Sequence, residues 1–150
     1  MASLDLIKNT PSLNPVVIEA RRWLNTPYKH QASQIGVGTD CLGLIRGIYR
    51  SLIGDEPEKA PPYSRFWAEY GGHDELNRIG HNYFTPIQKN EFETGDVLLF
   101  QWRPGAVPKH LAIASSKQSM IHAHQGLAVC EVALSRWWHQ RLCNVYRFKI

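Results

Sequence analysis

The sequence contains little cysteine and no long apolar run. Its three cysteines, Cys41, Cys130 and Cys143, include no Cys-x-x-Cys spacing. Three thiols cannot all pair with one another, so at least one is free, and the pattern argues against both a disulfide framework and a thiolate zinc site. No stretch of 18 apolar residues is present that would span a bilayer.

A secretory leader is also missing from the start of the sequence. The first 15 residues, MASLDLIKNTPSLNP, have neither the basic n-region nor the apolar h-region of a signal peptide. We therefore expect synthesis in the cytoplasm without a signal peptide, and no insertion into a membrane.

The composition is that of a folded globular domain. Hydrophobic residues make up 43% of the 150 residues, and five of the residues are Trp. This length predicts one domain over residues 1–150, with a core that needs no metal or disulfide. The net charge of +4 suits an anionic partner, but the basic residues are scattered, so nucleic acid and an anionic polymer such as cell wall both remain open.

Helices are predicted first along the chain and strands later. Asn14 and Pro15 cap a predicted helix that Asn25-Thr26-Pro27 ends, and Asp40 caps a second helix that stops at Gly54. The second helix has apolar residues at helical spacing: Leu42, Ile45, Ile48, Tyr49 and Leu52. Short helices are expected at 64–70 and 74–79, and strands at 96–100, 110–115, 119–124, 127–134 and 144–150. This order predicts an α+β fold with N-terminal helices packed on a central antiparallel β-sheet.

Cys41 is the candidate nucleophile because it lies at the start of the second predicted helix. Unpaired N–H groups and the positive end of the helix dipole favour a thiolate there, and they can donate to an oxyanion. His110 opens a predicted strand and His122 lies on the next one, so adjacent antiparallel strands would bring the two imidazoles together. Cysteine, histidine and a third polar residue are the parts of a nucleophilic site.

Each of these residues has a simpler explanation when taken alone. A lone cysteine is commonly a small buried apolar side chain, and Asp40 is accounted for as an N-cap. His122 and His124 form a His-x-His spacing that suits a metal, although no carboxylate or thiolate of suitable spacing completes a ligand set. Cys130 and Cys143 lie in or beside apolar strands, where a core position is expected.

Taken together, the motifs resemble the NlpC family of papain-like cell-wall cysteine peptidases. Five segments carry the resemblance, in family order and within residues 15–150: TPYKHQ, GTDCLGL, TGDVLLF, KHLAIA and MIHA. The stretch TPYKHQASQIGVGTDCLGLIRGIY is most similar to the branch encoded with phage tails and gene transfer agents. The resemblance implies a papain-like, NlpC-type fold and a single peptidase domain.

The resemblance also implies roles for individual residues. Cys41 matches the nucleophile, His110 the general base and acid, and His122 the residue that orients His110. Tyr28 matches a tyrosine near the oxyanion, and Asp40 matches an acidic residue that meets a substrate amine. Gly43 matches a glycine that would let the helix approach the sheet closely. No metal or cofactor is implied.

The implied activity is hydrolysis of an amide bond in peptidoglycan stem peptides. The bond is the one between γ-D-glutamate and a diamino acid, and the implied partners are these stem peptides and phage-tail-like structural proteins rather than nucleic acid. Such an enzyme would be incorporated into a phage-like particle and act in the periplasm or cell wall.

The sequence departs from the family pattern beside the nucleophile. The serine that follows the cysteine in the family is Leu42 here, and the loop between Tyr28 and Cys41 lacks the usual Gly-Gly. Substrate preference is therefore expected to differ from that of ordinary cell-wall hydrolases. Two other functions stay open: an acyltransferase or amidase with the same Cys-His-His site, and a non-enzymatic tail or wall-binding module.

Overall fold

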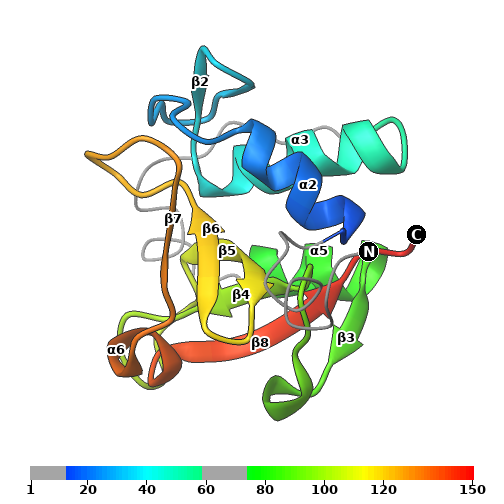
Figure 1. Cartoon of the computed structure of the whole chain (residues 1–150). Coiled ribbons are helices and arrows are strands. Elements are labelled where there is room, and N and C mark those ends of the chain that lie inside the picture. The colour runs from blue at the N-terminus through cyan, green and yellow to red at the C-terminus, as the bar shows by residue number, and fades with distance from the viewer. Residues whose placement is uncertain (1–12, 59–73) are drawn as a thin grey trace, which may run out of the picture.

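A six-stranded sheet with helices beside it dominates the computed structural model, which describes residues 13–58 and 74–150 (Figure 1). The helices are α2 (Pro15–Arg22), α3 (Cys41–Leu52), α5 (Glu75–Tyr83) and α6 (Arg136–His139), with the 3-10 helix η1 (Lys89–Glu91). The strands are β1 (Ser33–Gln34), β2 (Gly38–Thr39), β3 (Thr85–Ile87), β4 (Val97–Phe100), β5 (His110–Ser116), β6 (Ser119–His122), β7 (Cys130–Ala133) and β8 (Leu142–Arg147).

The sheet has the strand order β3-β8-β4-β5-β6-β7, and each neighbouring pair is antiparallel. Strand β8 is last in the chain but lies between β3 and β4, so the C-terminal segment is held inside the sheet (Figure 1). Strands β1 and β2 form a separate small hairpin. The expected α+β fold, with N-terminal helices on an antiparallel sheet, is confirmed.

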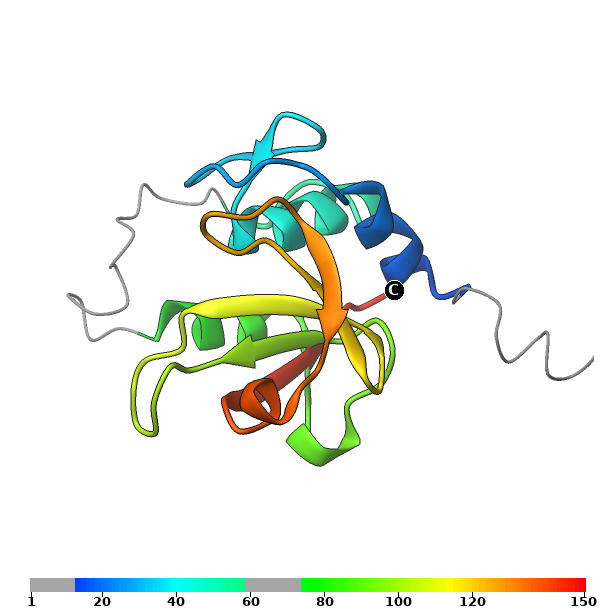
Figure 2. The same ribbon diagram turned by 60° about the vertical axis from the view of Figure 1, so that its left-hand side comes forward.

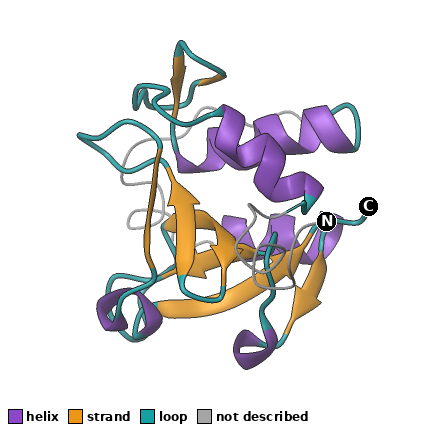
Figure 3. Ribbon diagram, viewed as in Figure 1, coloured by secondary structure: helices purple, strands orange, loops and turns teal. Residues whose placement is uncertain are grey.

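The two faces of the sheet pack against different elements. Because side chains alternate along a strand, Leu111 and Ile113 of β5 face the core that α2 and α3 complete, whereas Ala112 and Ala114 face a second core. Trp138 of α6 packs against that second core. Helices α2 and α3 therefore cover one face and α6 lies against the other, as Figure 2 and Figure 3 show.

Close packing of α2 on α3 depends on a glycine in α3. A Cβ added at Gly47 would lie 2.1 Å from a ring carbon of Trp23, which directly follows α2. Helix α2 itself begins as expected, since the Asn14 side chain accepts hydrogen bonds from the N–H groups of Val16 and Val17, and Pro15 is its first residue.

Several predicted boundaries differ from the structure. Helix α3 buries Leu44 fully and Leu42 only partly, because Trp23 and the sheet contact the helix from two sides. The strand predicted at 127–134 pairs only over Cys130–Ala133, because Leu127 N–H bonds back to His124 within a turn and Val129 pairs with Asn25 and Thr26. The helix predicted at 64–70 lies outside the described residues, whereas the one predicted at 74–79 is α5. In the described ranges, no helix is long and apolar enough to span a membrane.

Candidate active site

Cys41 is the first residue of α3 and lies against the start of β5. Its Sγ is 3.8 Å from the carbonyl oxygen of Lys109, to which the thiol donates. The backbone N–H of Leu111 also interacts with the sulfur. Lys109 and Leu111 flank His110 in the chain, so the thiol lies beside the main chain of His110.

His110 and His122 form a buried imidazole pair. His110 begins β5 and His122 ends β6, and the register that pairs Ile113 with Ile121 places the two histidines diagonally on one face. Their Nε2 and Nδ1 atoms, respectively, are 2.8 Å apart, and the residues are only 5% and 3% exposed. The structure thus brings together the two histidines that the sequence placed on adjacent strands.

This hydrogen bond leaves only one ring nitrogen of His110 available. Nε2 is engaged with His122, so a proton from the thiol would have to be taken up at Nδ1. Nδ1 is the ring nitrogen nearer the main chain of His110, and the Cys41 sulfur contacts the main chain on both sides of that residue. With Nδ1 as acceptor, Nε2–H donates to Nδ1 of His122.

Burial favours the neutral form of all three side chains. Burial, and next the charge of Asp40, raise the pKa of Cys41 to about 12. Burial lowers the pKa of His110 well below its ordinary value and, with His124, lowers the pKa of His122 to about 4. Loss of hydration thus opposes the thiolate that the helix N-terminus is expected to favour, and the backbone hydrogen bonds to the sulfur offset only part of it.

The Asp40 carboxylate is engaged by backbone groups. Its Oδ1 accepts from Gly43 N at 2.7 Å and its Oδ2 accepts from Gln31 N at 2.7 Å, while His30 Nδ1 is 4.0 Å from Oδ2. Asp40 is only 3% exposed. It therefore caps α3 and fixes the loop before β1 next to Cys41, as the simpler explanation of this residue predicts.

Tyr28 is held beside the segment that leads into Cys41. It forms an isolated parallel bridge with Thr39, and the N–H of Lys29 donates to the carbonyl of Thr39 at 3.0 Å. The Tyr28 side chain is half-buried and packs against the same core as Cys41 and Leu42. The structure thus places Asp40 and Cys41 at the helix start and Tyr28 beside the residue that precedes them, while His110 and His122 lie at the ends of β5 and β6.

Gly43 allows a close approach, but to a different element from the one expected. A Cβ added there would lie 2.0 Å from the carbonyl oxygen of Ala32 and 2.6 Å from Thr39 Oγ1. The glycine thus brings α3 close to the segment around β1 and β2, and not to the large sheet.

Aromatic residues around the imidazole pair were not predicted from the sequence. Trp102 and Trp138 lie within ring-contact distance of His110, and so does His124. The sequence signal was the adjacent pair Trp137-Trp138, but no periodicity links that pair to the histidines. Helix α6 connects β7 to β8, and its packing against the second core is what places Trp138 beside them.

A metal site is not formed by the described residues. They contain no group of three or more His, Cys, Asp or Glu side chains placed to hold a metal ion. His122 and His124, the pair with metal-like spacing, have ring centroids 5.7 Å apart, and Nδ1 of His122 is already bonded to His110.

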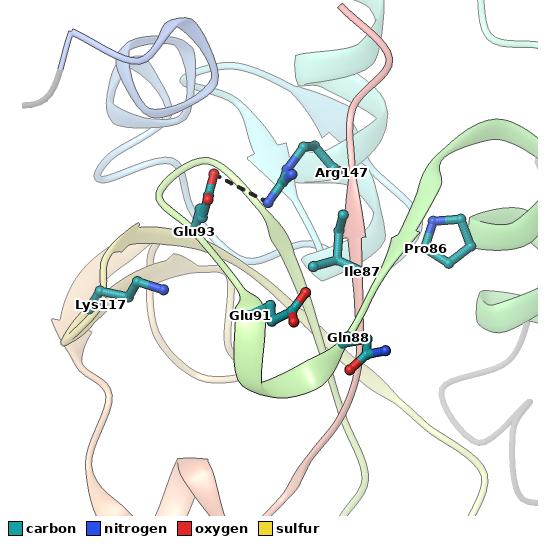
Figure 4. A pocket seen from close by; sticks show the side chains of 7 residues that line it. All are labelled: Pro86, Ile87, Gln88, Glu91, Glu93, Lys117 and Arg147. Carbon is teal, nitrogen blue, oxygen red and sulfur yellow. Dashed lines mark ion pairs between the residues drawn. The ribbon is translucent and has the colours of Figure 1, made fainter.

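A charged pocket of about 490 Å³ lies at the opposite end of β5 from His110 (Figure 4). Lys117, which follows β5, lines it together with Glu93 and Arg147, whose side chains are 3.4 Å apart. Its remaining lining residues are Pro86, Ile87, Gln88 and Glu91. The pocket is separate from the thiol and the imidazole pair.

A comparison with models of known protein families shows to which family this chain belongs. The model of the NlpC/P60 family matches residues 25–147, which is most of the chain and includes Cys41, His110 and His122. The chain belongs to the NlpC/P60 family. The family resemblance of the five sequence motifs is therefore confirmed, and no curated protein sequence matches the chain.

Solved structures of NlpC/P60 proteins share the fold. The NlpC/p60 domain of the peptidoglycan hydrolase SagA has 24% identity and a TM-score of 0.60, covering 89% of this chain and 97% of that domain. An NlpC/P60 family protein from Bacillus cereus has 20% identity and a TM-score of 0.63, covering 93% and 41%. NlpC2 from Trichomonas vaginalis has 16% identity and a TM-score of 0.62, covering 94% and 49%. The chain thus spans less than half of the latter two proteins.

Proposed function

We propose that this NlpC/P60 protein is a cysteine peptidase that hydrolyses amide bonds in peptidoglycan stem peptides. Two observations support the proposal: the Cys41 thiol contacts the carbonyl of Lys109, directly before His110, and His110 is hydrogen-bonded to His122. Peptidoglycan hydrolysis is named for the SagA domain, whose fold this chain shares. The scattered positive charge also suits an anionic wall polymer.

In the proposed mechanism, His110 acts as a general base through Nδ1. The thiol exchanges its hydrogen bond with the Lys109 carbonyl for one with Nδ1, which takes the proton as Sγ attacks the substrate carbonyl. His122 accepts from Nε2–H and stabilises the imidazolium that forms. A thiolate present beforehand is not required, which agrees with the raised pKa of Cys41.

The rest of the cycle follows from the same groups. The backbone N–H of Cys41 and the Tyr28 hydroxyl hold the oxyanion, and His110 returns its proton to the leaving amine as the thioester forms. Water then attacks the thioester, with His110 again acting as base, and releases the free carboxylate. No metal or cofactor takes part in these steps.

Finer parts of the proposal rest on the sequence motifs. We propose that the bond cut joins γ-D-glutamate to a diamino acid and that the protein is carried in a phage-tail-like particle. We also propose that Asp40, whose carboxylate accepts hydrogen bonds from the N–H groups of Gly43 and Gln31, meets a substrate amine, as the family resemblance implies. We also propose that the 150 residues form one domain, since Val16 and Phe148 share a core.

The test is mass spectrometry of peptidoglycan fragments after incubation with purified protein. Wild type should release fragments that end at γ-D-glutamate, and Cys41→Ala should release none while keeping its fold. Cys143→Ala is the matched control, because that thiol donates to Leu99 O at 3.2 Å, away from the histidines. Equal release by wild type and Cys41→Ala would overturn the assignment.

An added amine acceptor separates hydrolysis from acyl transfer. If the new amide product exceeds the free carboxylate, the protein is an acyltransferase with the same site. If no fragment or amide appears with any wall substrate, the non-enzymatic wall-binding function is favoured.

A further inference from the structure

Two tryptophans from different elements cover the His110 ring. Trp102, in the loop between β4 and β5, is nearly parallel to His110, with a ring centroid distance of 5.6 Å and an angle of 23°. Trp138 of α6 is 5.4 Å away at 29°. The centroids of the two indoles are 6.1 Å apart, so the three rings form a compact triangle.

Trp138 also covers the partner of His110. Its ring lies 5.4 Å from that of His122 in an edge-to-face arrangement, with an interplanar angle of 88°. The two imidazoles are themselves edge-to-face, at 5.1 Å and 78°. One indole therefore contacts both rings that share the buried hydrogen bond.

The orientation of the His110 ring matters because its two nitrogens have different partners. Rotation of a histidine ring about its terminal torsion has only broad preferences, so a hydrogen bond alone leaves a flipped ring accessible. A flip would exchange Nδ1 with Cδ2 and Nε2 with Cε1, so that a carbon would face His122 in place of Nε2. Contacts from two indoles on neighbouring parts of the ring oppose that flip.

We propose that Trp102 and Trp138 are positioning residues that hold the His110 ring in its bond with His122 and keep water away from that bond. The consequence for turnover rests on the proposed function, but the orientation of the ring does not. The ionisable groups near the His110 ring are His122, His124 and, beside its main chain, Cys41.

The neighbouring tryptophan of α6 provides a matched control. Trp137 is 46% exposed, and its ring contacts are with Trp102, Trp138 and the guanidinium of Arg141, none of them an imidazole. Trp137→Leu makes the same type of substitution in the same helix, but it removes no side chain that contacts His110. Trp138→Phe is the conservative variant that keeps an aromatic ring over both histidines.

The direct test is proton NMR of the imidazole N–H shared by His110 and His122, with titration of both rings. A proton shielded from water gives a sharp downfield signal in wild type, Trp137→Leu and Trp138→Phe. In Trp138→Leu and Trp102→Leu, exchange with water should broaden it, and the titration midpoints should rise toward 6.5 because burial decreases. Hydrolysis should fall by up to about 100-fold in these two variants, as misplacement of a catalytic group by about 1 Å does.

The outcomes separate this inference from the proposed function. If Trp138→Leu folds and keeps the sharp signal and wild-type midpoints, Trp138 only fills the core and the inference is wrong. Trp102→Leu, in a loop, supplies the same test if Trp138→Leu does not fold. A wild type that shows the signal but releases no wall fragments would contradict the proposed function and leave the positioning of His110 established.

Discussion

Leu42 takes the place beside the nucleophile where the family motif has serine. Its side chain is half-buried and packs against the core shared by α2, α3 and the sheet. Leu42 therefore contributes to packing, and it has no hydroxyl group that could contact a substrate. The nucleophile itself keeps the same backbone setting, because Asp40 caps the helix directly before Cys41.

Replacing Leu42 should separate packing from specificity. We expect Leu42→Ser and Leu42→Ala each to lower the free energy of unfolding by about 1–2 kcal/mol, less than the 2–5 kcal/mol typical of a fully buried leucine. Only Leu42→Ser should raise kcat/KM for stem peptides that contain a diamino acid. Parallel denaturant unfolding and peptide hydrolysis assays measure both effects, and equal kinetics in the two variants would show that the hydroxyl is irrelevant.

The two histidines should differ in their effect on turnover. His110→Ala removes the proposed base and should reduce kcat by about 10²–10⁴-fold. His122→Ala should reduce it less, since Trp102 and Trp138 still contact the His110 ring. Steady-state hydrolysis by the two variants, with folding checked by circular dichroism, measures the difference; a larger loss in His122→Ala would reverse the assigned roles.

At the scale of elements, α3 is packed closely on two sides through glycines. A side chain at Gly43 would meet the backbone of Ala32, and one at Gly47 would meet the ring of Trp23. Backbone cannot move aside as easily as a side chain can. The glycines therefore determine how closely α3, and with it Cys41, approaches both neighbours.

Alanine at these glycines should be destabilising despite its higher helix propensity. We expect Gly47→Ala to cost about 1–3 kcal/mol through overpacking, and Gly43→Ala to cost more. Ser51→Ala, at an exposed position of the same helix, should change stability by less than about 0.5 kcal/mol. Urea unfolding of the three variants provides the comparison, and a stabilised Gly43→Ala would show that α3 can shift away from Ala32 without loss.

The sequence predicted elements well where local signals agree. Asn14 and Asp40 marked helix starts, and short apolar runs marked β4, β5 and β6. Strand β3 was not predicted because it contains Pro86, a residue that usually argues against a strand. Burial was not predicted from the sequence. The sequence indicates that Cys41 begins a helix, but it does not show that packing raises the pKa of the thiol or brings Trp138 over His122.

At the scale of the whole molecule, the buried histidines should make the fold sensitive to acid. The folded state holds the pKa of His122 at about 4, below the ordinary value of 6.5, so between these values the unfolded chain binds a proton that the folded one does not. The contribution of His122 to the free energy of unfolding is therefore fully present above about pH 6.5 and is lost as pH decreases toward 4. The difference corresponds to about 3 kcal/mol for this residue.

The pH dependence of urea unfolding measures this effect. His122→Gln should flatten the loss of stability between pH 6.5 and 4, because glutamine does not titrate in this range. His139→Gln, which alters an exposed histidine of α6, should keep the wild-type slope. An unchanged slope in His122→Gln would mean that His122 does not cause the acid sensitivity.

The contact between Cys41 and the start of β5 joins residues 68 positions apart in the chain. During synthesis, the thiol leaves the ribosome well before the strands that carry the two histidines, and β8, which is later still in the sequence, pairs between β3 and β4 to complete the sheet. A nascent chain that has been made only as far as α3 therefore carries the proposed nucleophile without its proposed base.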